Sequence, residues 1–462
     1  MEQANQIAFE KKPRQKKERR VEKGELSAAE RAEVERRLQI RALEQRTREL
    51  DEELFAQIKR PAVTLEESLE RIETVDSMRD GRELDCYELG ESGRNLTTRR
   101  IYEGEPPRIA YVKPQTGEIS FERDPETGTV KKVSRVWNPN TQSIDKHYES
   151  MEDDAEESLF SYHLNDRPNL LRTISEHYGI EVGDVPLNPE SLTMRLSIDV
   201  EKGAIREYIA SRIDELFHFD VVPLTVLRAE EDLTDISSVQ EAVRSSDPER
   251  PVRSIELEDL ADLKARGTEH PAAKSFIRIA CLDYLIKSTD RHCGNILYDP
   301  AREKYIAIDN GYSMGLSEIV DKKSRPADPL LTVPLELLQI EQDWKLDDEA
   351  LEELKRVYEA TKEYLALRQN KKSLGRELDL DKLDDIPTTV GKGKEIKYIS
   401  KLFRTLYGNE RIATKEALEF MKRVKKIIDL GRPPQLGPEE LSYLFSEEIY
   451  QALDETQVMQ GR

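Results

Sequence analysis

The chain has 462 residues, of which 36% are charged and 37% hydrophobic, and its formal net charge at pH 7 is −21. This acidic balance argues against general nucleic-acid binding, and no specific nucleic-acid partner is expected. No apolar run approaches the roughly 20 residues needed to span a bilayer, and the polar start predicts no signal peptide. Three scattered cysteines predict neither a disulfide framework nor a zinc site, so a reducing cytoplasm is the expected setting.

Residues 1–84 are expected to form a charged tail followed by a long helix. Residues 11–20 carry seven Lys or Arg and one Glu, which fits either an arm for anionic lipid or nucleic acid or a solvated tail. Ser27 opens a capping-box pattern, and Pro61 is expected to end the helix. The helix could bind a partner protein or fold back on this chain.

A glycine loop and a lysine-bearing strand come next. Gly90, Ser92 and Gly93 precede a predicted strand at residues 108–114 that carries Lys113. In kinases such a loop covers the nucleotide phosphates, and a strand lysine grips them. The two glycines would let the backbone approach phosphate oxygens, and Ser92 would donate a hydrogen bond. Taken alone, the glycine pattern also fits a plain hairpin.

The following stretch is expected to be an insertion in the small lobe. Residues 114–200 mix turn sequences with an acidic run at 152–157. A helix is then predicted at residues 204–216, where apolar residues recur on one face. This pattern predicts one buried side and one exposed side.

The most informative stretch follows an apolar helix predicted at residues 271–287. The helix leads into Asp290, with Asn295 five positions later and Asp309 fourteen positions after that. One carboxylate can accept or orient the proton of an attacking hydroxyl. An amide oxygen and a second carboxylate can hold Mg²⁺ against the phosphates of ATP. The order and spacing of these residues therefore suit phosphoryl transfer.

The pattern Asp-Arg-His-x-x-Asn at 290–295, followed by Asp-Asn-Gly at 309–311, resembles that of the phosphatidylinositol 3-/4-kinase superfamily. Residues 283–286 before the loop and Val-Lys-Pro at 112–114 are most similar to the type II phosphatidylinositol 4-kinase branch. The resemblance implies an α+β, two-lobed protein-kinase-like fold with ATP and magnesium between the lobes. The N-terminal long helix and extra C-terminal helices would be additions to that fold.

The same resemblance implies roles for individual residues. Asp290 would orient or deprotonate the acceptor hydroxyl. Asn295 and Asp309 would bind magnesium. Lys113 would hold the α- and β-phosphates, and Glu207 would fix the position of this lysine.

Two assignments have alternatives. Glu207 could instead be a surface acid beside Arg206. His292 would stabilise charge on the transferring group if the resemblance holds at that position, or it could be a hydrogen-bonded spacer in the loop.

The domain prediction follows from these assignments. It comprises a charged tail and long helix (1–84), a kinase-like small lobe with insertion (85–235), a kinase-like large lobe with catalytic and activation loops (236–372), and a C-terminal helical extension (373–462). In the activation loop, Lys322, Lys323 and Arg325 could meet an anionic headgroup or be solvated.

The predicted function is that of an ATP- and magnesium-dependent kinase that transfers the γ-phosphate to a hydroxyl of an inositol lipid or a protein. The sequence lacks the cysteine cluster that lipidates the type II branch. Membrane contact would therefore be transient, through basic residues, and the location cytoplasmic or peripheral to a membrane. Two alternatives remain open: a non-catalytic pseudokinase or helical scaffold, and a kinase fold that transfers AMP.

Overall fold

The computed structural model describes most of the chain, namely residues 28–57, 64–88, 97–115, 118–138, 143–151, 154–193, 195–229, 235–316, 330, 332–340, 343–368 and 394–436. Several predictions fall outside these ranges: those for the basic segment 11–20, Pro61, Gly90, Ser92, Gly93, Lys322, Lys323 and Arg325.

A five-stranded antiparallel sheet carries Lys113. Its strands lie in the order β1 (Glu83–Glu88), β2 (Thr98–Tyr102), β3 (Arg108–Pro114), β9 (Ile236–Glu241) and β8 (Thr225–Ala229). Because side chains alternate between the two faces of a strand, Ala110 and Val112 of β3 face away from Lys113. Both pack in an apolar cluster with Val75 and Met78 of α2 (Leu65–Asp80). The helix α2 therefore covers one face of the sheet, and Lys113 projects from the other.

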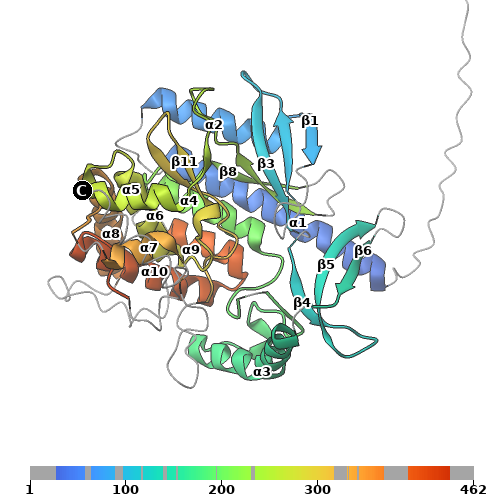
Figure 1. Cartoon of the computed structure of the whole chain (residues 1–462). Helices are drawn as coiled ribbons and strands as arrows, with labels where there is room; N and C mark the ends of the chain where they lie inside the picture. Colours follow the sequence, from blue (N-terminus) through green and yellow to red (C-terminus); the bar gives the residue numbers. More distant parts are fainter. Residues whose placement is uncertain are drawn as a thin grey trace, which may run out of the picture.

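The predicted insertion is a folded unit between β3 and α4 (Gly203–Phe217). It contains a four-stranded antiparallel sheet and one long helix: β6 (Ser143–Glu149), β5 (Val130–Asn138), β4 (Ser120–Arg123), β7 (Ser191–Leu192) and α3 (Asp154–Tyr178). Its small core includes Phe121 and Phe160, whose rings stack with centroids 3.8 Å apart. Figure 1 shows this unit below and to the side of the five-stranded sheet.

One large apolar core joins α4 to the helices of the C-terminal half. These are α6 (Ala273–Ile286), α7 (Val333–Ile340), α8 (Asp348–Arg368), α9 (Lys394–Tyr407) and α10 (Glu410–Leu430). The last two helices complete this core and are not a separate appendage (Figure 1). The amphipathic prediction for α4 was wrong. Every residue from Ala204 to Phe217 is buried, because the sheet packs against one side of α4 and the helices α8 and α9 pack against others.

The N-terminal helix folds back on the chain. α1 (Ala28–Glu52) continues as a π-helical turn (Glu53–Gln57) and buries Asp51 against α2 and α4. The Asp51 carboxylate accepts hydrogen bonds from Arg212 Nε (2.6 Å) and the Tyr208 hydroxyl (2.8 Å), and it pairs with Arg79. A buried charge is tolerated only when it is paired in this way, so the Asp51 pairs fix α1 to α2 and to α4.

A three-stranded sheet and a short helix lie beside the predicted catalytic loop, which carries the motif at residues 290–295. The sheet has the order β10 (Arg253–Ser254), β11 (Ile296–Asp299) and β12 (Lys304–Ala307), and α5 (Leu257–Arg266) follows β10.

The five-stranded sheet continues through β9, beyond the domain boundary predicted at residue 235. Antiparallel sheets with largely separate helices confirm the α+β fold class. Within the residues that the structure describes, no helix is both long and apolar enough to cross a membrane.

Candidate active site

Three charged side chains predicted from the sequence meet on the face of the five-stranded sheet that lies opposite α2. Lys113 Nζ lies 3.0 Å from Glu207 Oε1 on α4 and 3.0 Å from Asp309 Oδ1. Burial opposes the charge of Lys113, but the carboxylates of Asp309 and Glu207 outweigh burial and raise its pKa. Burial likewise opposes ionisation of Asp309, and Lys113 overcomes this and lowers the Asp309 pKa. Lys113 and Asp309 are therefore both charged at neutral pH.

The β11–β12 hairpin brings the two predicted magnesium ligands to the same place. Asn295 immediately precedes β11, Asp309 follows β12 by one residue, and Ile296 pairs with Ala307. The backbone N–H of Ile308 donates to the Asn295 carbonyl over 3.0 Å, and Asn295 Nδ2 donates to the Asp290 carbonyl over 2.8 Å. The hairpin thus joins the Asn295 backbone to that of Ile308, the residue before Asp309, and the Asn295 side chain ties this segment to the backbone of the predicted catalytic aspartate.

The backbone of Asp309 has an unusual conformation. Its φ is +56°, in the left-handed region that non-glycine residues adopt at a cost of roughly 1–2 kcal/mol. Such conformations cluster at functional sites, where the surrounding structure holds them. This conformation accompanies the contact between the Asp309 carboxylate and Lys113.

Arg291 joins both halves of the site, although the sequence analysis gave it no role. Its side chain is fully buried and pairs with Asp283 of α6 over 3.1 Å. It also donates to the carbonyls of Asn295 and Ile308 and to the side-chain oxygen of Asn310. A single guanidinium therefore holds the catalytic loop against the Asp-Asn-Gly segment.

Asn310 extends this network to the lysine. Its Nδ2 donates to Glu207 Oε2 over 3.2 Å, while its oxygen accepts from Arg291. A continuous set of polar contacts therefore runs from Asp283 through Arg291, Asn310 and Glu207 to Lys113. The order of the motif residues in the sequence indicated a site here. Which partner each side chain contacts depends on the fold and could not be seen in the motif.

A small cavity of about 20 Å³ lies against this network, and Glu118 of the insertion lines it. Glu118 Oε2 accepts from the backbone N–H groups of Lys202 and Gly203 at the start of α4, over 3.0 and 3.4 Å. Burial raises the pKa of Glu118 to about 6, so the group is mostly ionised above neutral pH. Glu118 was not among the predicted site residues, because no motif marks it within the insertion.

The charges of this lining fit a magnesium-bound nucleotide. Glu118, Glu207 and Asp309 face the cavity with one cation, Lys113, so a bare polyphosphate would be repelled. Across the described ranges, no group of three or more His, Cys, Asp or Glu side chains could hold a metal ion by itself. Magnesium bound with ATP needs only one or two carboxylates, because phosphates and waters supply the other ligands. Asp309 and the Asn295 amide meet that requirement.

His292 is exposed, and it makes a hydrogen bond within its own loop, as expected for the alternative role of a hydrogen-bonded spacer. Its Nδ1 accepts the backbone N–H of Gly294 over 3.0 Å and caps the 3₁₀ turn Cys293–Asn295. The role in charge stabilisation stays a prediction for this residue. The Glu207 side chain, in contrast, is 3% exposed and pairs with Lys113. The alternative prediction, that Glu207 is a surface acid beside Arg206, was therefore wrong.

Replacing Lys113 with methionine is expected to weaken ATP binding by about 10- to 100-fold, since a charged hydrogen bond contributes about 1.5–3 kcal/mol. The variant should remain folded, because Asn310 still donates to Glu207. Calorimetric titration with ATP and magnesium measures the change. Lys304→Met is the matched control, since Lys304 is similarly exposed and pairs with Asp220 outside the cavity lining. Equal affinities of the two variants for ATP would show that Lys113 does not bind the nucleotide.

Comparisons with known proteins bear on the same region. Residues 262–385 match the family model described as phosphatidylinositol 3- and 4-kinase, and this stretch contains Asp290, Asn295 and Asp309. The match supports the predicted superfamily, and the type II branch stays a prediction. No curated protein matches the chain. One similar solved structure is titled "Crystal structure of A Helicobacter pylori proinflammatory kinase CtkA". It is 10% identical, with a TM-score of 0.26 over 77% of this chain and 95% of that chain.

Proposed function

We propose that the chain is an ATP- and magnesium-dependent phosphotransferase that acts on a hydroxyl acceptor. The observation that carries the proposal is the placement of Lys113 Nζ, 3.0 Å from both Glu207 and Asp309. Kinases use a strand lysine, a helical glutamate and a metal-binding aspartate in the same combination. The family-model match over residues 262–385 supports it independently.

In this proposal Asp290 receives the acceptor. The acceptor hydroxyl oxygen forms a bond to the γ-phosphorus, and the bond from that phosphorus to the bridging oxygen of ADP breaks. Asp290 orients the hydroxyl and takes its proton. The catalytic loop holds Asp290 through Asn295 Nδ2, which donates to the Asp290 carbonyl. This hydrogen bond supports the proposal by restraining the backbone of Asp290 within the loop.

Lys113, Asn295 and Asp309 would hold the nucleotide. Lys113 would contact the α- and β-phosphates, with Glu207 keeping its ammonium in place. Asn295 and Asp309 would be the protein ligands of magnesium, which when bound neutralises the charge that develops on the phosphates. The three carboxylates of the lining make the site dependent on that cation.

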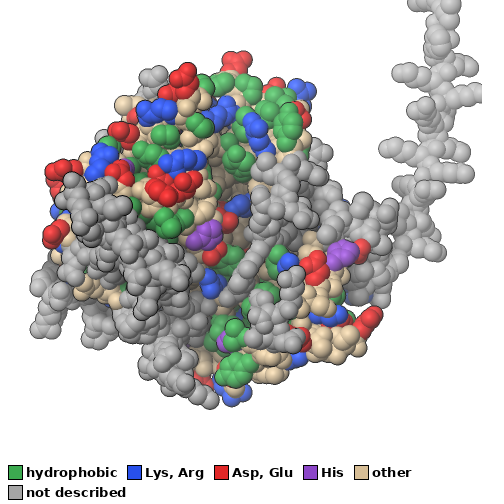
Figure 2. All heavy atoms as spheres, viewed as in Figure 1, with side chains coloured by type: hydrophobic (Ala, Val, Ile, Leu, Met, Phe, Trp, Pro, Cys, Tyr) green, Lys and Arg blue, Asp and Glu red, His purple; other side chains and the backbone are tan. Residues whose placement is uncertain are grey.

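The acceptor we propose is an inositol lipid or a protein, reached from the cytoplasm or from a membrane surface. Acidic and basic side chains lie interspersed over α2, α5 and β11 on the face in Figure 2. The concentrated positive charge is in residues 11–20, with seven Lys or Arg. Each basic residue near an anionic membrane contributes about 1 kcal/mol. Contact with a bilayer would therefore be transient and sensitive to salt.

Radiolabelled ATP is expected to label phosphatidylinositol in anionic vesicles, with labelling that falls steeply as salt rises and weakens when residues 1–25 are removed. The assay offers the vesicles and a protein extract in parallel, using ATP labelled at the γ- or at the α-phosphate. Label in protein alone would make the acceptor a protein. Label from α-phosphate would indicate AMP transfer. No turnover of ATP with any acceptor would favour the non-catalytic scaffold.

A further inference from the structure

The connection between the insertion and α4 reaches the catalytic loop. This connection, described at residues 193 and 195–202, leads from β7 to α4, and Arg195 projects from it. Arg195 Nη2 donates to the Thr289 carbonyl over 2.6 Å and lies 3.9 Å from Asp290 Oδ1. The Arg195 side chain is 24% exposed, and the Asp290 side chain is 32% exposed. A cation from the insertion thus stands beside the proposed catalytic carboxylate.

The backbone around Arg195 is fixed by buried groups. Thr193 is fully buried; its hydroxyl donates to the Arg195 carbonyl over 2.8 Å and accepts the Arg195 N–H over 3.1 Å. The buried Arg167 of α3 donates to the carbonyls of Leu196 and Asn188. The insertion therefore determines where Arg195 points, through α3 and through the turn that Thr193 closes.

The same connection touches the chain beyond the Asp-Asn-Gly segment. The N–H of Leu316 donates to the Ser197 carbonyl over 3.2 Å. A Cβ at Gly315 would lie 2.2 Å from Ser197 Oγ, so any larger residue there would force the Ser197 side chain to move. On the other side of the loop, the N–H and hydroxyl of Thr289 donate to the Tyr312 carbonyl over 2.9 and 2.7 Å. Through Arg195 and Ser197, the connection thus contacts both segments that form the proposed site.

We propose that Arg195 is a positioning residue that the insertion supplies to Asp290, an inference that rests on the proposed phosphotransferase function. By holding the Thr289 carbonyl, Arg195 fixes the backbone one residue before Asp290. Its charge also attracts the carboxylate and restrains it toward the acceptor. Arginine suits both tasks, because its planar fork addresses two acceptors at fixed geometry. The insertion is thereby part of the catalytic apparatus.

Steady-state kinetics test this role. Arg195→Met is expected to lower kcat by about 10- to 100-fold, the loss that misplacement of a reacting group by about 1 Å produces. The KM for ATP should change less than about twofold, because Arg195 does not line the nucleotide cavity. Arg195→Lys should recover part of kcat, since it keeps the charge and loses the fork. An unchanged kcat, or an equal rise in KM, would overturn the proposal.

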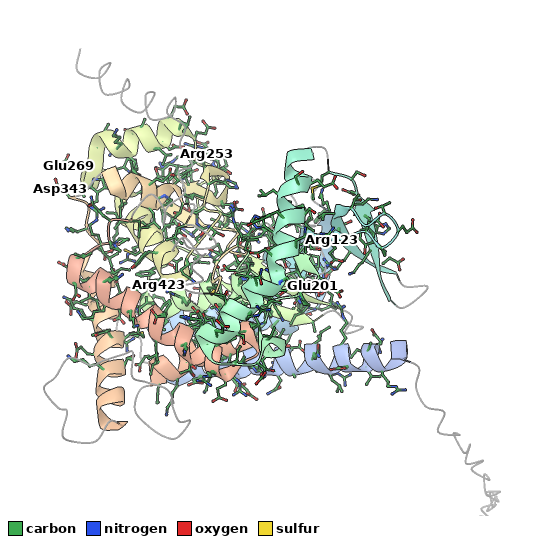
Figure 3. All side chains as sticks on the ribbon, turned by 90° about the horizontal axis from the view of Figure 1, so that it is seen from below. Arg123, Glu201, Arg253, Glu269, Asp343 and Arg423 are labelled. Carbon is green, nitrogen blue, oxygen red and sulfur yellow. The ribbon has the colours of Figure 1, made fainter. Side chains whose placement is uncertain are left out.

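A matched control lies on the same unit. Arg123 of β4 also donates to a backbone carbonyl, that of Gly128, and to Asn165, but both partners belong to the insertion. Figure 3 shows Arg123 on the four-stranded sheet of the insertion. The same view shows Glu201 near α3, where it pairs with Arg135 of β5 over 3.0 Å. Arg123→Met should leave kcat unchanged. A loss equal to that of Arg195→Met would mean that any damage to the insertion lowers activity.

Hydrogen exchange separates this inference from the proposed function, because it needs no turnover. In Arg195→Met, amide exchange in residues 288–296 is expected to rise, and in Arg123→Met it should match the unsubstituted protein. If the unsubstituted protein turns over no ATP, the phosphotransferase proposal fails, and this measurement alone still decides whether Arg195 holds the loop. Equal exchange in all three proteins would overturn the inference.

Discussion

Replacing Asp309 with asparagine is expected to reduce phosphoryl transfer by about a thousandfold or more while leaving the protein folded. A bound metal stabilises the transition state by several kcal/mol, and each 1.4 kcal/mol is a factor of ten in rate. Asparagine keeps the shape of the side chain and removes the charge. Lys113 keeps its partner in Glu207, 3.0 Å away, so the cleft retains a paired lysine.

Melting curves provide the second readout for Asp309. ATP with magnesium should raise the Tm of the unsubstituted protein, and Asp309→Asn should lose most of the magnesium-dependent part of that rise. Asp429→Asn is the control, because Asp429 is an exposed aspartate that pairs with Lys425 on the surface of α10. A magnesium-dependent rise that survives in Asp309→Asn would place the metal elsewhere.

The parts of the site that lie close together in the sequence could be predicted, because their chemistry and their spacing are local. Asp290 and Asn295 share one loop, and a hairpin then returns the chain to Asp309. The strand around Lys113 was also predicted within its exact bounds, Arg108–Pro114. Glu207 was placed by its position on a helix, and the structure pairs it with Lys113.

The remaining parts depend on contacts between distant segments. Arg195 meets Thr289 across 94 positions of sequence, so no local pattern marks it. Asp51 reaches Arg212 across 161 positions, and the local sequence of α1 could not show that this carboxylate would be buried. The burial of α4 on all sides was missed for the same reason. Its periodicity shows one apolar face, but Arg206 and Arg212 on its other faces are buried because they find carbonyl or carboxylate partners.

Arg291→Met is expected to lower the free energy of unfolding by about 3–5 kcal/mol, the loss measured when one partner of a buried ion pair is removed. Asp283 is fully buried, and among the described residues its carboxylate would keep only the Thr332 hydroxyl, 2.7 Å away, in the variant. Domains are typically stable by about 5–15 kcal/mol, so this is a large fraction of the total. Chemical denaturation measures it. Arg253→Met is the control, since Arg253 makes an exposed pair with Asp259, with both bonds at 2.6 Å, and should lose less than about 1 kcal/mol (Figure 3).

The loss in Arg291→Met should also depend on pH. Burial already raises the pKa of Asp283 in the presence of Arg291, and removing the guanidinium removes the main force that opposes this rise. A carboxyl whose pKa is higher in the folded than in the unfolded state binds more protons when folded, so stability falls as pH rises through the folded pKa. The variant should therefore be less destabilised at pH 5 than at pH 8. A second substitution, Asp283→Leu, should recover part of the stability at pH 8, because no uncompensated charge then remains. A loss that is equal at both pH values and is not relieved by Asp283→Leu would mean that Arg291 stabilises the fold through its carbonyl contacts and not through Asp283.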